Sequence, residues 1–182
     1  EILYLHENSL EILPAGIFRN NVKLRELGLS TNQLKELPAD LFQELYNLED
    51  IRMFKNQLET IPSGLFRNNI NLKIIHLNPN QLRELNVDQF KILFSLEILW
   101  LSHNKLETLP LGLFRSNEKL RELYLSDNQL RELHADLFEE LSSLSMLELS
   151  RNKLETLPGR LFHRNVMLRE VRLSNNLLKE IH

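Results

Sequence analysis

The chain has 182 residues, a net charge of −3 and 42% hydrophobic residues, a composition typical of one soluble, folded domain with a substantial core. It contains no cysteine, which excludes disulfides, cysteine nucleophiles and cysteine metal sites. No apolar run approaches the roughly 18 residues of a membrane span, and the basic residues are scattered, so we expect no membrane span here and no nucleic-acid partner.

One pattern, L-x-x-L-x-L-x-x-N-x-L, recurs along the whole chain. Its asparagines stand 24 residues apart, at Asn8, Asn32, Asn56, Asn80, Asn104, Asn128, Asn152 and Asn176. Leucines alternate with other residues just before each asparagine, and such alternation predicts a short strand with one buried face. The expected strands therefore lie, in chain order, in the stretches 2–6, 26–30, 50–54, 74–78, 98–102, 122–126, 146–150 and 170–174.

The stretch "LRELYLSDN" illustrates the expected structure of one repeat. Leu123 and Leu125 should point inward, and Glu122 and Tyr124 outward. Strands stacked about 4.8 Å apart would then form a parallel sheet along the chain. Asn128 ends the strand, and its amide can bond backbone groups of the turn and of the neighbouring repeat.

The second half of each repeat contains a phenylalanine in constant register, and these account for seven of the nine in the chain: Phe18, Phe42, Phe66, Phe90, Phe114, Phe138 and Phe162. We expect them to fill the core from the convex side, because one repeat cannot close a core alone. The residues three positions later alternate between asparagine and leucine: Asn21, Leu45, Asn69, Leu93, Asn117, Leu141 and Asn165. This 48-residue super-period predicts two convex designs, one closed by leucine packing and one by asparagine hydrogen bonds. Phe94 lies outside the register, and we expect it to pack between repeats.

The form LxxLxLxxNxLxxLPxxLF at 24 residues resembles the leucine-rich repeats of extracellular animal proteins such as Toll-like receptors, variable lymphocyte receptors and Slit-like adhesion proteins. The resemblance implies an α/β leucine-rich repeat solenoid, a horseshoe with a parallel sheet of about eight short strands on the concave face. Loops, turns or short helices would form the convex face. Residues 1–182 would form one domain of about 7.5 repeats. Cysteine-rich caps are not visible, so we expect a segment of a larger protein or a shortened form of one.

Three outward columns follow from this fold, since the strand leucines face the core and the intervening residues line the concave face. The first column is Ile2, Glu26, Asp50, Ile74, Ile98, Glu122, Met146 and Glu170. The second column is Tyr4, Gly28, Arg52, His76, Trp100, Tyr124, Glu148 and Arg172. The third column is His6, Ser30, Phe54, Asn78, Ser102, Ser126, Ser150 and Ser174.

Neighbouring positions in these columns predict one large apolar area, which we call the concave patch: Phe54, Ile74, His76, Ile98, Trp100, Tyr124 and Met146. Charged residues would form its polar rim: Arg52, Lys55, Glu122, Glu148 and Arg172. Contiguous exposed apolar patches mark partner sites, and Trp and Tyr are enriched among binding hot spots. The alternative is that the aromatic residues only cover the sheet and stabilise it through cross-strand pairing.

No pattern for catalysis is present. P-loop, G-x-S-x-G and H-E-x-x-H sequences are absent, and "SDN" at 126–128 lacks the S-x-x-K and K-T-G that accompany it in serine β-lactamases. His76 and His103 come close by repeat register, but no carboxylate completes a metal triad beside them. We therefore expect no enzyme activity, no cofactor and no metal site.

The predicted function is recognition of a protein or microbial ligand on the concave face, in innate immunity or receptor signalling, with Trp100 and Tyr124 as anchors. The alternative is a cell-adhesion or assembly scaffold that pairs with another repeat protein, and a homodimer is compatible with it. The resemblance implies an extracellular location, secreted or as a receptor ectodomain. The absence of cysteine caps and of N-x-[ST] glycosylation sequons weakens that expectation.

Overall fold

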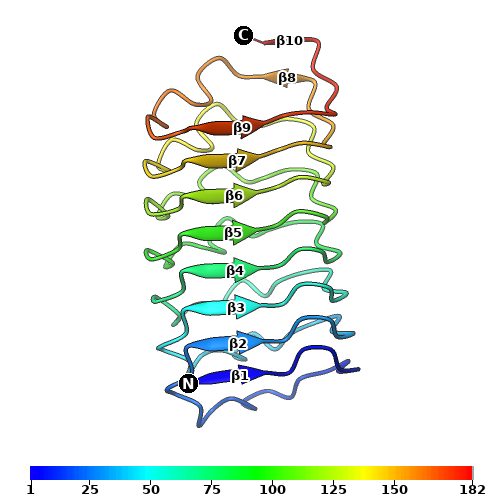
Figure 1. Ribbon diagram of the computed structural model, residues 1–182, viewed down its shortest axis with the longest axis vertical. Coiled ribbons are helices and arrows are strands. Elements are labelled where there is room, and N and C mark those ends of the chain that lie inside the picture. The colour runs from blue at the N-terminus through cyan, green and yellow to red at the C-terminus, as the bar shows by residue number, and fades with distance from the viewer. Residues whose placement is uncertain (182) are drawn as a thin grey trace.

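The computed structural model describes residues 1–181, so the predicted domain end at His182 lies outside the described residues. Eight strands form one parallel sheet in the order β1-β2-β3-β4-β5-β6-β7-β9 (Figure 1). Their bounds are β1 Ile2–Tyr4, β2 Glu26–Gly28, β3 Asp50–Arg52, β4 Ile74–His76, β5 Ile98–Trp100, β6 Glu122–Tyr124, β7 Met146–Glu148 and β9 Glu170–Arg172. The predicted solenoid with eight short parallel strands is confirmed.

In the eight-stranded sheet, each residue of β1 to β7 pairs with the residue 24 positions, or one repeat, further along the chain. Leu3 faces Leu27, and Leu123 faces Leu147. The central residue of each strand points into the core. The residues on either side of it lie on the concave face, where Gly28, Asp50 and Glu148 are buried and the others are half-buried or exposed. A second, smaller parallel sheet, which the sequence did not predict, pairs β8 (Thr156–Leu157) with β10 (Glu180–Ile181).

Turns, and not helices, form the convex side. Leu65 N–H bonds Pro62 O at 3.0 Å, Arg67 N–H bonds Gly64 O at 3.1 Å and Asn69 N–H bonds Phe66 O at 3.0 Å, so this stretch is a series of four-residue turns. Residues 1–181 contain no helix, hence none long and apolar enough to cross a membrane. Of the loops, turns or short helices expected on the convex face, the structure has turns. The short segments there form isolated turns instead of the consecutive i→i+4 bonds of a helix.

The phenylalanines of the second halves stack behind the sheet, as predicted. Phe42 and Phe66 have ring centroids 6.2 Å apart at an interplanar angle of 17°, and Phe114 and Phe138 lie 6.1 Å apart at 27°. All four are buried. Each ring fills the space between two turns, which is why a core forms only when repeats stack.

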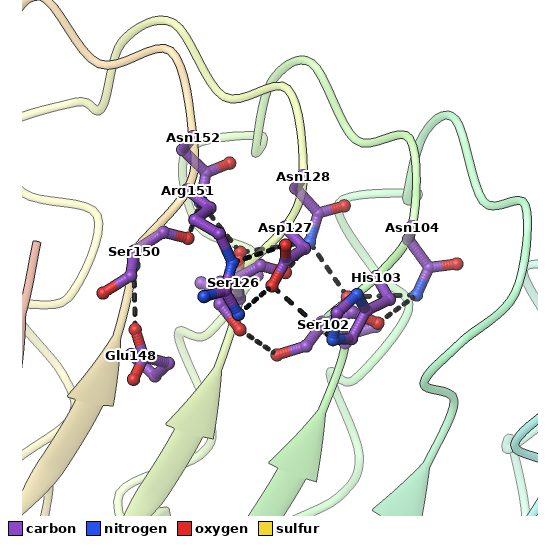
Figure 2. A network of polar contacts seen from close by, with 12 residues as sticks. Ser102, His103, Asn104, Ser126, Asp127, Asn128, Glu148, Ser150, Arg151 and Asn152 are labelled. Atoms are coloured by element: carbon purple, nitrogen blue, oxygen red, sulfur yellow. Dashed lines mark hydrogen bonds and ion pairs between the residues drawn. The ribbon is translucent and has the colours of Figure 1, made fainter. Parts of the chain in front are cut away.

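The strand-terminating asparagines join successive repeats. The Asn128 amide nitrogen donates to Leu101 O at 3.0 Å and Leu125 O at 3.1 Å, and its oxygen accepts the Leu106 N–H at 3.0 Å. Figure 2 shows Asn104, Asn128 and Asn152 in equivalent positions along the edge of the sheet. Because Leu101 and Leu106 belong to the preceding repeat, each side chain locks one repeat onto the one before it.

The 48-residue super-period is also present in the structure. The Asn117 amide nitrogen donates to Phe90 O at 3.0 Å and Leu93 O at 3.1 Å, and Asn69 and Asn165 make equivalent bonds. In the intervening repeats Leu45, Leu93 and Leu141 are buried. The two predicted convex designs therefore alternate.

These bonds lead to a prediction about stability. Replacing Asn128 by Ala leaves the buried Leu106 N–H without a partner, while Leu101 O keeps the Asn104 amide and Leu125 O keeps the Asn152 amide as donors. One such unpaired buried group costs about 1–3 kcal/mol. We expect the free energy of unfolding, measured by urea denaturation, to fall by at least about that amount. Asn8→Ala is the matched control, because Asn8 is exposed and bonds Leu5 O and His6 O of its own turn. An equal loss in both variants would contradict the inter-repeat role.

Candidate ligand-binding face

Four aromatic side chains form a continuous row on the concave face, the aromatic ladder: Phe54, His76, Trp100 and Tyr124. The Trp100 and Tyr124 rings stack at 3.8 Å and 10°, and His76 and Trp100 at 5.8 Å and 16°. Phe54 meets the edge of His76 at 6.3 Å and 67°. Strand register causes this order, because His76, Trp100 and Tyr124 pair directly across β4, β5 and β6.

The aliphatic residues of the concave patch flank this ladder. Ile74 pairs with Ile98 across β4 and β5, and Met146 pairs with Glu122 across β6 and β7. All seven side chains of the concave patch are half-buried. The structure thus brings the predicted residues together, and much of their surface is covered by one another.

The ladder is uncharged at neutral pH. Burial, and a hydrogen bond of 2.8 Å from the Tyr124 hydroxyl to Glu122 Oε2, raise the pKa of Tyr124 to about 12. Burial also lowers the pKa of His76 below its ordinary value of 6.5, because a desolvated imidazolium is disfavoured. A neutral, partly desolvated surface suits contact with an apolar part of a partner.

The two arginines of the predicted rim are paired with carboxylates. Arg52 contacts Asp50 at 2.7 Å, and Arg172 contacts Glu170 at 2.6 Å. Glu148, predicted as an exposed rim group, is instead largely buried: its carboxylate accepts the Ser150 N–H at 2.9 Å. This backbone bond holds it against the strand end, so Glu148 stabilises the turn more than it presents charge.

A charged row that the sequence analysis missed lies beside the patch, just beyond the strand ends. The Asp127 carboxylate lies 2.6 Å from Arg151 Nε and 3.5 Å from His103 Nε2 (Figure 2). The hydrogen bond from Arg151 holds the pKa of Asp127 below its usual value. All three residues have a positive φ of 54°. The sequence signal for this row is the series "SHN", "SDN" and "SRN". Its middle residues stand 24 positions apart and place an acidic residue between two basic ones.

The expectation for Phe94 was wrong, because its side chain is 57% exposed. It continues an apolar row just before the strands, which we call the flank stripe: Val22, Tyr46, Ile70 and Phe94, all exposed. These residues occupy one repeat position, and Asn47 and Asn71 bond the carbonyls of Val22 and Tyr46, joining the successive turns. The stripe therefore lies on the side of the solenoid, separate from the concave patch.

Comparison with known proteins explains this architecture. The sequence model described as leucine rich repeat matches residues 1–58, 22–80, 51–106, 70–130 and 118–178. The chain belongs to the leucine-rich repeat family. A search of curated proteins by sequence gave no match.

Solved structures similar to this leucine-rich repeat chain include complexes of TLR13 and of Toll. The TLR13–ssRNA13 complex superposes with a TM-score of 0.92 at 30% identity, over 100% of this chain and 26% of that one. The Toll–Spatzle complex of Drosophila superposes at 0.77 and 24% identity, over 100% of this chain and 30% of that one. Its glycosylated form gives 0.84 and 29%, over 99% and 27%. The chain thus spans between a quarter and a third of the length of these receptors.

The search for a metal site in this leucine-rich repeat domain gave no candidate. Within residues 1–181, no three or more histidine, aspartate or glutamate side chains come together in a group that could hold a metal ion. His103 contacts Asp127, and Arg151 occupies the opposite side of the same carboxylate. The arrangement is an ion-pair row.

The titration of His76 tests the packing of the ladder. Burial against Trp100 disfavours the imidazolium, so Trp100→Ala should raise the pKa of His76 toward 6.5, as followed by NMR of the ring protons. In the native chain the unfolded state binds the proton first as the pH falls through 6.5, so His76 reduces stability below that pH. Phe94→Ala, on the flank stripe, should leave the pKa unchanged. No shift in the Trp100 variant would show that another group buries His76.

Proposed function

We propose that the chain is a non-enzymatic recognition module that binds a protein or microbial ligand on its concave face, in innate immunity or receptor signalling. The observation that carries the proposal is the aromatic ladder, in which stacked rings form a neutral surface across four consecutive strands. The chain is also similar to Toll in its complex with Spatzle and to TLR13 in its complex with ssRNA13. This similarity supports a ligand-binding role for the fold.

Binding explains the ladder better than sheet stabilisation alone. Cross-strand pairing accounts for aromatic residues next to one another, but it requires no tryptophan on a solvent face. Trp100 is the one tryptophan in the chain and stands in the middle of the concave patch. Hot spots are enriched in Trp and Tyr near the centre of an interface, surrounded by residues that exclude water. Ile74, Ile98 and Met146 are suited to that surrounding role.

A protein partner fits the charges of this face better than a nucleic acid. Carboxylates outnumber guanidinium groups in the first two columns: Glu26, Asp50, Glu122, Glu148 and Glu170 against Arg52 and Arg172. Phosphate binding requires unpaired basic groups, and both arginines are already paired with carboxylates. The comparisons give no support for excluding nucleic acid in general, since TLR13 is complexed with ssRNA13. An extracellular or receptor-ectodomain location forms part of the proposal.

The test is to compare ligand binding by two alanine variants. Once a ligand has been captured with the native chain as bait, Trp100→Ala should weaken its affinity roughly 30-fold or more, as measured by calorimetry. Phe94→Ala is the matched control, because it removes an exposed aromatic ring outside the concave face. Unchanged affinity in Trp100→Ala and in Phe54→Ala would refute the concave-face proposal.

A second function, as an adhesion or assembly scaffold, is favoured by the flank stripe. Four exposed apolar side chains in register form a surface suited to pairing with another repeat protein or a second copy. We expect a concentration-dependent dimer in this case, detected as mass in solution and abolished by Ile70→Asp. Loss of the dimer in Trp100→Ala instead would assign pairing to the concave face. A monomer at all concentrations would rule out self-pairing.

A further inference from the structure

One position in the second column lacks a side chain. From β1 to β6 this column presents a planar group at every strand except β2: Tyr4, Arg52, His76, Trp100 and Tyr124. Gly28 occupies the remaining position, between Tyr4 and Arg52. The column of flat side chains therefore has a gap one strand wide.

The backbone does not require glycine at this position. Gly16 and Gly112 have positive φ values, whereas Gly28 does not and pairs as an ordinary strand residue. Glycine inside a strand weakens it and often marks a place where another group approaches closely. In this structure the Tyr4 ring makes that close approach, so an outside group would enter the position only where Tyr4 moves aside.

The gap is partly closed by Tyr4 and would admit one flat ring only after Tyr4 turns aside. Tyr4 and Arg52 lie two strand spacings apart, about 9.6 Å at the backbone, and a ring stacked between two planar groups needs about 7 Å. The Arg52 guanidinium carbon now lies 6.0 Å from the Tyr4 ring centroid. Tyr4 leans into the gap, since a Cβ on Gly28 would lie 2.7 Å from Tyr4 Cδ1. Its side chain is exposed, but its hydroxyl donates to Glu26 Oε2 at 2.8 Å, so widening the gap requires the Tyr4 ring to turn and this bond to break or follow.

A hollow of about 300 Å³ opens beside this gap, lined by Tyr4, His6, Glu7, Gly28, Ser30, Arg52 and Phe54. Ser30 is 2% exposed, and its hydroxyl has no hydrogen-bond partner. Elsewhere in the third column the Ser126 hydroxyl donates to the Ser102 hydroxyl at 3.0 Å. Ser30 instead has His6 and Phe54 as its neighbours in this column. The hollow thus combines flat apolar walls with one unused polar group at its base.

We propose that the Gly28 gap binds an aromatic side chain with a polar edge, such as tyrosine, from a protein ligand. The ring stacks between Tyr4 and the Arg52 guanidinium and completes the column, and its hydroxyl bonds Ser30. Arginine stacks on aromatic faces while keeping its ion pair, here with Asp50 at 2.7 Å. The nearby carboxylates Glu7 and Glu26 disfavour a nucleotide, whose phosphate they would repel. The inference rests on the proposed use of the concave face.

The probe for this site is N-acetyl-tyrosinamide, titrated into the full chain and followed by amide NMR. We expect saturable shifts centred on Gly28 and Ser30. Gly28→Phe fills the gap from within and should abolish those shifts, while its dispersed spectrum and its urea midpoint report on folding. Tyr4→Ala removes one stacking wall and should weaken the probe roughly two- to tenfold, which tests the site without altering Gly28.

Three outcomes would overturn the inference. If N-acetyl-leucinamide bound with the same affinity as the tyrosine probe, ring stacking would play no part. Uridine binding in its place would assign the gap to a nucleobase. Undiminished binding to Gly28→Phe would move the site elsewhere. Trp100→Ala should leave the probe unaffected while losing the captured ligand, so failure at Gly28 and failure of the concave-face function are distinguishable.

Discussion

The hydrogen bonds of the strand-terminating asparagines are the constraint on which the rest of the structure depends. Asn128 bonds Leu101 and Leu106 of the preceding repeat as well as Leu125 of its own, so it fixes the register of two repeats at once. The same bonds to the preceding repeat recur from Asn32 to Asn176, and the chain contains no cysteine. Because the register is fixed, residues 24 positions apart are always neighbours across the sheet.

Fixed register determines the chemistry of the concave face. Strands about 4.8 Å apart bring outward rings close enough to stack, and the Trp100 and Tyr124 rings lie 3.8 Å apart. Stacking removes water from the covered ring faces, and this desolvation lowers the pKa of His76. Desolvation together with the hydrogen bond to Glu122 raises the pKa of Tyr124. The strand register of the scaffold alone thus stacks these rings into a neutral surface.

The period made most of the fold predictable, since it identifies which residues are neighbours. The strands, the asparagine bonds, the phenylalanine stack and the grouping around Trp100 all follow from 24-residue spacing. Exposure does not follow from spacing. Phe94 lies outside the packed register and Glu148 turns back to its own backbone, and both depend on rotamers that a one-dimensional pattern does not contain. The row of His103, Asp127 and Arg151, by contrast, is visible in the sequence at 24-residue spacing and was missed because the prediction considered only the strand positions.

The stacked rings and the Gly28 gap present different parts of their side chains to a partner. Trp100 and Tyr124 cover one another's faces, so a ligand meets chiefly their edges, a broad contact with little demand on its shape. At Gly28 the Tyr4 ring leans over the position that lacks a side chain, and a ligand group must displace this ring and lie flat between Tyr4 and Arg52. On one rigid sheet, the apolar surface of the ladder contributes affinity for a ligand and the gap contributes specificity. Because the register holds both in place, a ligand that binds them together needs two contact groups at a fixed separation.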